Sequence, residues 1–289
     1  MTERPGTSGH LVCAFAATRT PPSPGALAAA RGHEEGGPLR LLRAGDLHLV
    51  VQDVPAASFD EAALTARLNH PADLERCARA HHRGVEAAAR PGPAVPLPMA
   101  TLYRSDRSAA EAVTSREAAL TALLDRLEGR TEWAVKVHTA ETAPAPTPTP
   151  PTTPTPAAAP SDGSAAGAGA DGRAYLSRAS VRRRVRQDAQ GRASAAARGV
   201  DAELRRYAVE ATRHRPQSES LTGRRTPQLL NAAYLVDDAR RAEFTEALAR
   251  IGAQADALGV EIAVSGPWIP YSFARWDEES APEWQEVCT

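Results

Sequence analysis

Cys77 and His81 are the pair in this 289-residue sequence whose spacing comes nearest to that of a metal site. Residues four positions apart share one face of a helix, so a thiolate and an imidazole could bind one ion there, with His82 adjacent. A second pair of ligands is missing, and His70 could join only through the tertiary fold. The spacing therefore favours a packed helix interior, and no metal is expected.

A glycine pattern at residues 167–172 matches a dinucleotide-binding motif. Gly167, Gly169 and Gly172 fit G-x-G-x-x-G. That site needs a strand before the glycines, so that the turn directs the phosphates toward a helix N-terminus, whereas a proline-rich stretch precedes them here. The match is therefore interpreted as linker composition, and no cofactor is expected.

The sequence offers no set of catalytic residues that spacing can justify. It contains no G-x-S-x-G nucleophile elbow, no Walker A loop and no H-E-x-x-H zinc helix. Cys13, Cys77 and Cys288 are odd in number and far apart, which argues against a disulfide framework and favours a reducing cytoplasm. No apolar run is long enough to cross a membrane, and the first residues do not resemble a secretory signal. A non-enzymatic cytoplasmic protein without a membrane partner is predicted.

The strongest local charge lies in residues 173–215, which contain twelve arginines and four acidic residues, although the whole chain has a formal net charge of −1. Such a face could bind the phosphates of nucleic acid. However, the densest arginines have no aromatic residues between them that could stack on bases. Docking on the protein's own acidic tail or on an acidic partner is favoured, and RNA binding is kept as the alternative. The candidate contact residues are Arg182, Arg183, Arg184 and Arg186.

A concentration of aromatic residues at 265–276, SGPWIPYSFARW, is the second unusual feature. Pro267 and Pro270 exclude a helix there, so the segment is expected to be extended. It could present aromatic anchors to another protein. Because large aromatic side chains seldom stay exposed, packing on the second domain as a hydrophobic strap is favoured. The partner-binding candidates in this segment are Trp268, Tyr271 and Phe273.

The elements that position these residues begin with a small sheet. Apolar runs predict strands at residues 11–17, 39–43, 47–54 and 132–138, and the second and third are joined by a tight hairpin at Ala44-Gly45. Residues 94–103 are apolar but contain prolines, which predicts an edge or bulged strand.

Helices are predicted between these strands. Ser58 and Glu61 have the spacing of a capping box. After Pro71, apolar residues recur at helical period on one face, which includes Leu74 and His81. A further helix has four leucines at helical spacing and ends before Gly129.

Residues 140–172 contain eight of the chain's 24 prolines and no apolar side chain larger than alanine. Such a segment cannot form a core and is interpreted as a disordered linker. Beyond it, the patterns predict a long Arg-rich helix at 173–213, strands at 229–236 and 260–266, and a helix between these strands. The fold prediction is therefore α+β, with a small domain at 1–139, a Pro/Ala/Gly linker at 140–172, and a second, ferredoxin-like domain at 173–289.

Several of these segments resemble, in order along the chain, the gas vesicle protein L/F family. SGPWIPYSF is similar to the family's C-terminal signature, and GRTEWAVKVH to its Glu-Trp-Gly-Val-Lys-Val block. HHRGVEAAARPGPAVPLPMATLY resembles its His-containing helix and following strand, Gly172 with Tyr175 and Leu176 its Gly-x-x-Tyr-Leu segment, and LLNAAYLVD a strand of its second domain. Ile269, Ala134 and Pro98 depart from the family's usual residues, and the linker is unusually long.

The resemblance implies a cytoplasmic accessory protein of gas vesicle assembly, associated with the gas vesicle. It also implies that the partners are the hydrophobic shell subunit and other accessory proteins, with the second domain ferredoxin-like. It does not distinguish the L type from the F type.

Overall fold

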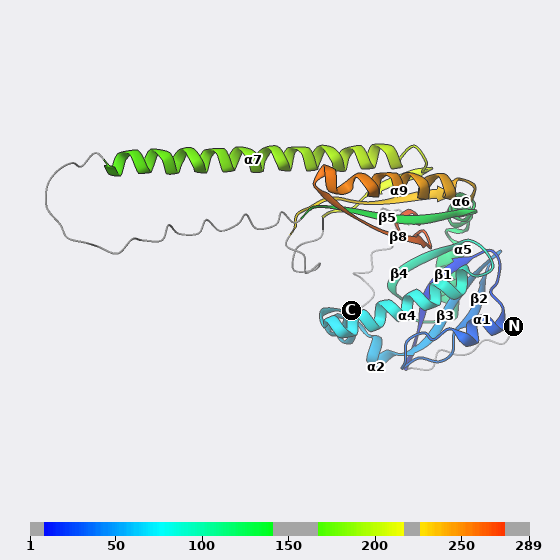
Figure 1. Ribbon diagram of the computed structural model, residues 1–289. Coiled ribbons are helices and arrows are strands. Elements are labelled where there is room, and N and C mark those ends of the chain that lie inside the picture. The colour runs from blue at the N-terminus through cyan, green and yellow to red at the C-terminus, as the bar shows by residue number, and fades with distance from the viewer. Residues whose placement is uncertain (1–8, 141–166, 217–225, 275–289) are drawn as a thin grey trace. The chain divides into compact units, whose positions relative to one another are not determined.

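The structure is a computed structural model that describes residues 9–140, 167–216 and 226–274. These residues form two four-stranded antiparallel sheets with accompanying helices, so the α+β class is confirmed (Figure 1). The chain divides into two compact units. Among the described residues, the first unit contains those up to Trp133, Leu235–Ala239 and those from Gly266 to Ala274, and the second contains those from Ala134 to Tyr234 and Arg240–Ser265.

The strands of the first sheet lie in the order β2-β3-β1-β4. The buried strand β1 (His10–Thr18) pairs antiparallel with β3 (Leu47–Pro55) and with β4 (Ala94–Tyr103). β2 (Arg40–Ala44) and β3 form the predicted hairpin, in which Gly45 has the φ of +64° that suits a two-residue turn. The proline-containing β4 lies at the edge, and its register against β1 shifts between Ala14 and Ala16, as predicted for an edge or bulged strand.

Six helices accompany this sheet in the described part of the first unit. They are α1 (Pro24–Ala29), α2 (Ala56–Phe59), α3 (Glu61–Asn69), α4 (Pro71–Ala89), α5 (Asp106–Thr114) and α6 (Glu117–Leu127). α4 begins with Pro71, where a missing N–H costs nothing, and α6 ends shortly before Gly129, which has a φ of +65°. α4 therefore starts, and α6 ends, where the sequence predicted.

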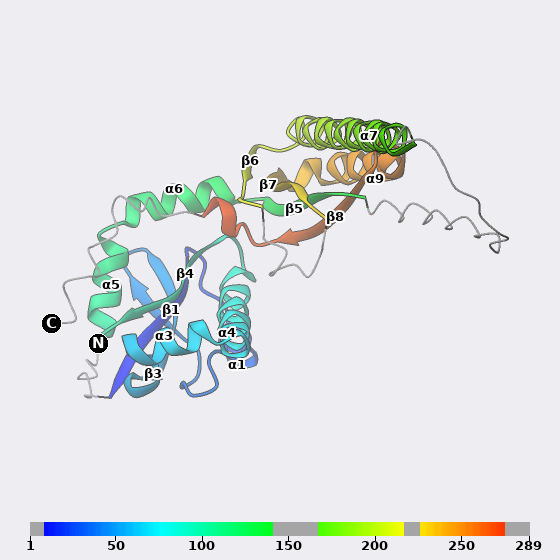
Figure 2. The same cartoon turned by 90° about the vertical axis from the view of Figure 1, so that its left-hand side faces the viewer.

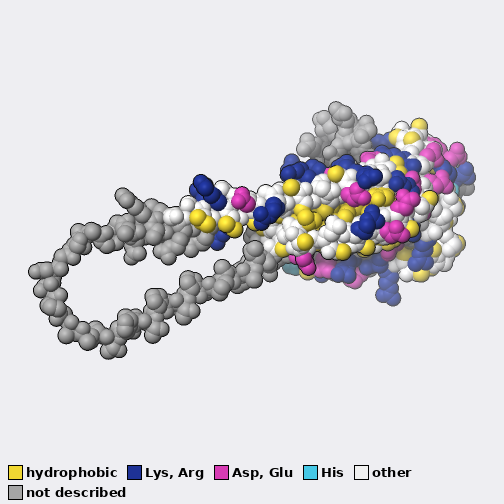
Figure 3. Space-filling view, turned by 45° about the horizontal axis from the view of Figure 1, so that its top comes forward, with side chains coloured by type: hydrophobic (Ala, Val, Ile, Leu, Met, Phe, Trp, Pro, Cys, Tyr) yellow, Lys and Arg dark blue, Asp and Glu magenta, His cyan; other side chains and the backbone are white. Residues whose placement is uncertain are grey.

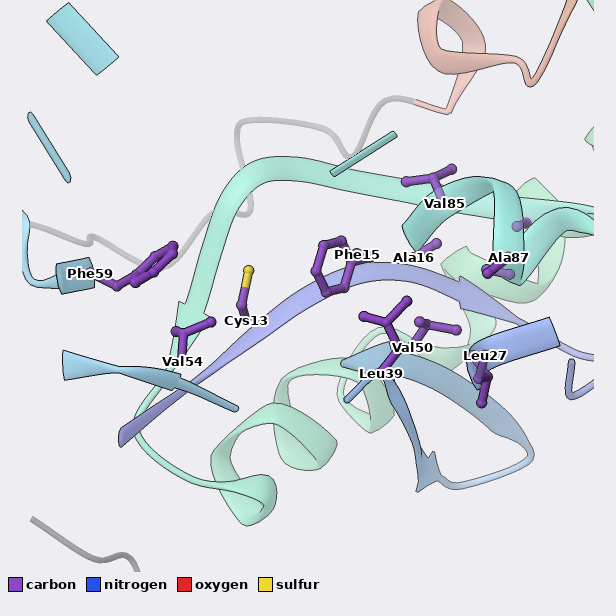
Figure 4. Close-up of a cluster of buried hydrophobic side chains, with 12 residues drawn as sticks. Cys13, Phe15, Ala16, Leu27, Leu39, Val50, Val54, Phe59, Val85 and Ala87 are labelled. Carbon is purple, nitrogen blue, oxygen red and sulfur yellow. The ribbon is translucent and has the colours of Figure 1, made fainter. Parts of the chain in front are cut away.

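The core of the first unit lies between β1 and α4. Phe15 of β1 is fully buried and points toward α4, near Val85 and Ala87 (Figure 4). Gly84 permits this approach, because a Cβ atom at that position would lie 2.4 Å from the Phe15 ring. Cys77 and His81 lie on the buried face of the same helix, so they are packed side chains, as predicted.

Two details of these helices differ from the sequence predictions. Asp60, rather than Ser58, caps α3, and its carboxylate accepts a hydrogen bond from the Ala63 amide at 2.8 Å. Ser58 lies inside the short helix α2, which the capping-box spacing did not reveal. Leu74 is 39% exposed, although the helical period places it on the same face as His81, because it lies near the start of α4 and before the first buried residue of that face, Cys77.

The second sheet has the order β6-β7-β5-β8. Its strands are β5 (Arg130–Thr139), β6 (Glu210–Arg213), β7 (Gln228–Asp237) and β8 (Val260–Trp268). The strand expected at 132–138 therefore does not complete the first sheet. It lies between β7 and β8 instead, because a strand of alternating pattern can satisfy its backbone hydrogen bonds in either sheet.

Helices α7 (Gly167–Leu204) and α9 (Arg241–Leu258) lie side by side on one face of the second sheet (Figure 2). Short 3₁₀ turns occur at Asp238–Arg240 and Tyr271–Phe273. Residues 141–166 of the predicted linker are outside the described residues, whereas residues 167–172 form the first turns of α7 rather than coil. The predicted long helix also ends earlier than 213, and residues 210–213 form β6 instead.

Both sheets follow the same path. Each takes a strand, a helix and two strands, then one or more helices and a last strand, and in each the spatial order is second, third, first, fourth. The sequences of the two halves gave no sign of this repetition. No helix in the described ranges combines the length and the apolar character needed to cross a bilayer.

Candidate protein-binding site

The C-terminal strap, residues 266–274, packs beside α4 in the first unit. Ile269 and Tyr271 lie against the core cluster, and Phe273 and Ala274 are buried. A strap was predicted, but its location is corrected: it covers the first unit and not the second domain. The apolar side chains of the strap pack against the apolar cluster that β1 and α4 share, which removes them from water.

Tyr271 connects the strap to α4 through His82. Its hydroxyl lies 3.0 Å from His82 Nδ1, and the Nε2 of His82 lies 3.4 Å from the Glu86 carboxylate. The hydrogen bond between the Tyr271 hydroxyl and His82 Nδ1 joins the strap to α4, and the tautomer of the imidazole decides which of the two groups donates. Burial, and then the carboxylates of Glu86 and Glu132, raise the pKa of Tyr271, which keeps the hydroxyl protonated.

Glu132 of β5 holds the next residue of the strap. The Ser272 amide donates to one oxygen of the Glu132 carboxylate at 2.8 Å, and the Ser272 hydroxyl donates to the other at 2.7 Å. Glu132 is buried, and hydrogen bonds to a charged acceptor are stronger than neutral ones. This double contact fixes the strap backbone one residue after Tyr271.

Gly266 lets the strap begin close to β5. Its φ is +143°, a conformation that residues with side chains rarely adopt, and an added Cβ would lie 2.9 Å from the Glu132 carbonyl oxygen. The Trp133 ring would be 3.1 Å away. A larger residue would therefore push the strap away from β5.

Trp268 is the exposed part of this site. Its indole is 46% exposed and meets the His82 ring edge to face, with the ring centroids 6.3 Å apart. The Tyr271 ring lies 6.0 Å from the same imidazole on a tilted plane. Trp268 is thus an aromatic side chain held by a fixed neighbour and still open to solvent, the arrangement expected of an interface anchor.

The predicted contact residues do not all gather here. Trp268, Tyr271 and Phe273 share the strap, with Trp268 exposed, Tyr271 half-buried and Phe273 buried in the core. The arginines lie on α7 in the second unit, where Arg183, Arg184 and Arg186 are exposed. The side chain of Arg182 is outside the described residues.

Sequence reasoning did not single out His82, Glu86, Glu132 or Ser272 as site residues. A signal was nevertheless present, because each lies in one of the segments that carry the family resemblance. HHRGVEAAAR supplies His82 and Glu86, GRTEWAVKVH supplies Glu132, and SGPWIPYSF supplies the strap. These three segments are far apart in the sequence and meet at this site.

Comparison with known proteins identifies a family over most of the chain. The family model described as "Gas vesicle synthesis protein GvpL/GvpF" matches residues 12–275. A curated relative, gas vesicle protein L of Streptomyces sp. (strain CB03234), is 39% identical over 252 residues, which cover 87% of this chain and 89% of the relative.

Two solved structures share the fold. The gas vesicle protein GvpF from Anabaena sp. PCC7120 superposes with a TM-score of 0.62 at 15% identity, covering 93% of this chain and 97% of that one. GvpF from Microcystis aeruginosa superposes with a TM-score of 0.57 at 16% identity, covering 93% and 100%. These matches give no support to the RNA-binding alternative.

Proposed function

Since the chain belongs to the gas vesicle synthesis protein GvpL/GvpF family, we propose that it is a non-enzymatic accessory protein that binds the hydrophobic gas vesicle shell subunit. Binding would keep the subunit soluble until it joins, or nucleates, a growing vesicle in the cytoplasm. A subunit that faces gas on one side exposes more contiguous apolar surface than a soluble protein tolerates, so it requires a cover. Contacts with other accessory proteins belong to the same proposal.

The exposed indole of Trp268 is the observation that carries this proposal. Tyr271 and Ser272, on the strap that carries Trp268, are fixed by His82 and by Glu132, so little side-chain and backbone freedom remains to be lost on binding. An aromatic anchor on a rigid base is typical of residues that dominate the affinity of a protein interface. Phe273 is buried, so it would contribute to binding indirectly, by anchoring the strap that carries Trp268.

Co-expression with the shell subunit tests the proposal. The parent protein should move the subunit from the pellet to the supernatant and remain bound to it in a pull-down. Trp268→Ala should raise the dissociation constant of that complex more than tenfold, since truncating a central aromatic anchor costs about 2 kcal/mol or more.

Leu74→Ala is the matched control for this experiment. Leu74 is 39% exposed on α4, in the same unit as Trp268 but outside the strap, and its truncation should leave the complex unchanged. If the subunit stays insoluble with the parent protein, or if both variants weaken binding equally, the masking role assigned to Trp268 is wrong.

A finer description of the fold belongs with this proposal. The element order β5-α7-β6-β7-α9-β8, with β5 between β7 and β8, supports a ferredoxin-like description of the second sheet. That residues 140–172 link a domain at 1–139 to a domain at 173–289 stays a prediction. The place of β5 between β7 and β8 argues against independent folding of the two parts.

A further inference from the structure

The first half of α7 has an apolar row that nothing in the described chain covers. Val181 is 56% exposed and Val185 60% exposed, and Ala189 continues the row at the same spacing of four residues. Further along, the same row is buried at Ala193 and Ala197, where α7 packs in the second unit. Residues 181–192, here called the projecting part of α7, therefore leave two valines in solvent.

Positive charge surrounds these valines. Arg183, Arg184 and Arg186 are exposed, and none forms an ion pair with another residue in the described ranges. Asp188 is the single acidic residue between Arg173 and Val200 in the sequence. Figure 3 shows dark blue and yellow side chains together along this helix. Like charges at this density repel one another, so an acidic occupant with an apolar side would be favoured.

The sequence of this protein contains a segment with that chemistry. Residues 276–289 lie outside the described part of the chain and carry no basic residue. They contain two tryptophans, Trp276 and Trp284, that could cover the valines. Their five carboxylates oppose the arginines in sign and come from Asp277, Glu278, Glu279, Glu283 and Glu286.

We infer that the projecting part of α7 is a docking site for residues 276–289 of a second copy of this protein. The two surfaces differ, so the contact is heterologous and each molecule can both give its acidic segment and receive one. Copies then associate head to tail. This inference goes beyond the proposed function and does not depend on the shell subunit.

Association of this kind should be weak and sensitive to salt. Exposed ion pairs contribute little singly, and at 0.5 M salt charges are screened over a few ångströms. Sedimentation of the full chain should therefore show reversible, concentration-dependent association at low salt, with a dissociation constant at least tenfold higher at 0.5 M salt.

Two charge-reversal variants give the decisive test. The helix variant R183E/R184E/R186E keeps its acidic segment but loses the site, and the segment variant E278K/E279K/E283K keeps the site but loses the segment. Each variant alone should be monomeric. Their mixture should form one-to-one dimers that grow no further, because the helix variant can only donate and the segment variant can only receive.

A control addresses non-specific charge effects. R76Q/R79Q removes two exposed arginines of α4 that are already paired with Asp73 and Glu75, and it should associate like the parent. The inference is overturned if the parent is monomeric at low salt, which is also the result expected of a contact within one chain. It is equally overturned if the mixture of variants stays monomeric while circular dichroism shows both to be folded.

Discussion

Removing the hydroxyl of Tyr271 measures how much its hydrogen bond, as distinct from the packing of its ring, stabilises the strap. Tyr271→Phe keeps the ring against the core but loses the bond to His82 Nδ1. The free energy of unfolding should fall by about 0.5–1.5 kcal/mol, the usual net contribution of such a bond. Urea unfolding of the single and double variants with His82→Ala measures the coupling.

The double variant is the control for that measurement. If Tyr271 and His82 act as a pair, Tyr271→Phe should cost almost nothing once His82 is alanine. Additive losses would show that the hydroxyl and the imidazole stabilise the strap independently.

His81, which is buried, and His33, which is partly buried, give the first unit a pH dependence. Burial lowers the pKa of His81 to about 4 and that of His33 to about 4, the latter with help from His81, and both flank the Phe15 ring. Between about pH 4 and pH 6.5 the unfolded chain, with an ordinary histidine pKa of 6.5, binds protons at these histidines that the folded chain does not bind. Stability is therefore complete above pH 6.5 and falls as the pH drops toward 4.

Urea unfolding between pH 5 and pH 7.5 checks this expectation. Each histidine could contribute up to about 3 kcal/mol over its full range, and less together because they interact. His81→Gln should flatten the profile, whereas His70→Gln, at a site where the side chain is 65% exposed, should leave it unchanged. A profile that stays steep in His81→Gln would assign the pH dependence to other groups.

The contact of α4 with β1 depends on Gly84, which has no side chain to collide with Phe15. Gly84→Ala would place a Cβ 2.4 Å from the Phe15 ring, so either the helix or the ring must move. We expect a loss of about 1–3 kcal/mol, typical of overpacking in a core. Thermal or urea unfolding measures it.

Gly191→Ala in α7 is the matched control. An added Cβ there meets nothing within 4 Å, so the substitution should stabilise the helix by about 0.5–1 kcal/mol. Opposite signs at the two glycines would assign the Gly84 effect to crowding. A loss of stability in both would contradict that explanation.

Local patterns were enough to predict most of the strands and the longer helices, but not α1, α2 or β6. The helical period after Pro71, the hairpin at Gly45 and the helix stop before Gly129 each depend on residues within a few positions of one another. The sheet that β5 joins was predicted wrongly, because its alternating sequence fits either sheet. The bond between Glu132 and Ser272 joins residues 140 positions apart, and no local pattern records such a pairing. Family resemblance identified the segments that meet at the site, but not their contacts.

Because β5 lies in the second sheet, cleavage of the chain after β5 should not separate the two fragments. A protease site inserted between Thr152 and Thr153 would leave β5 on the first fragment and β7 and β8 on the second. The Thr139 amide donates to the Pro227 carbonyl at 3.1 Å and the Ala140 amide to the Gly259 carbonyl at 3.0 Å, so the end of one fragment is bonded to the other. The cleaved protein should elute as one species and separate only in denaturant.

Size-exclusion chromatography before and after cleavage gives the result. Gel electrophoresis of the same sample in detergent confirms that the chain was cut. Two folded fragments that separate without denaturant would instead support independent domains on either side of residues 140–172.

The shared strand order of the two sheets is what duplication of an ancestral gene for one sheet and its helices would leave. Tandem duplication of a gene for one such unit leaves two sheets with one path, even after the sequences have diverged beyond comparison. In that history β5 is the first strand of the second copy and corresponds to β1, while the 38-residue α7 corresponds to the six-residue α1. The proline-rich stretch after β5 is then an insertion inside the second copy, not a joint between copies. Its length can change between lineages without altering the strand order of either sheet.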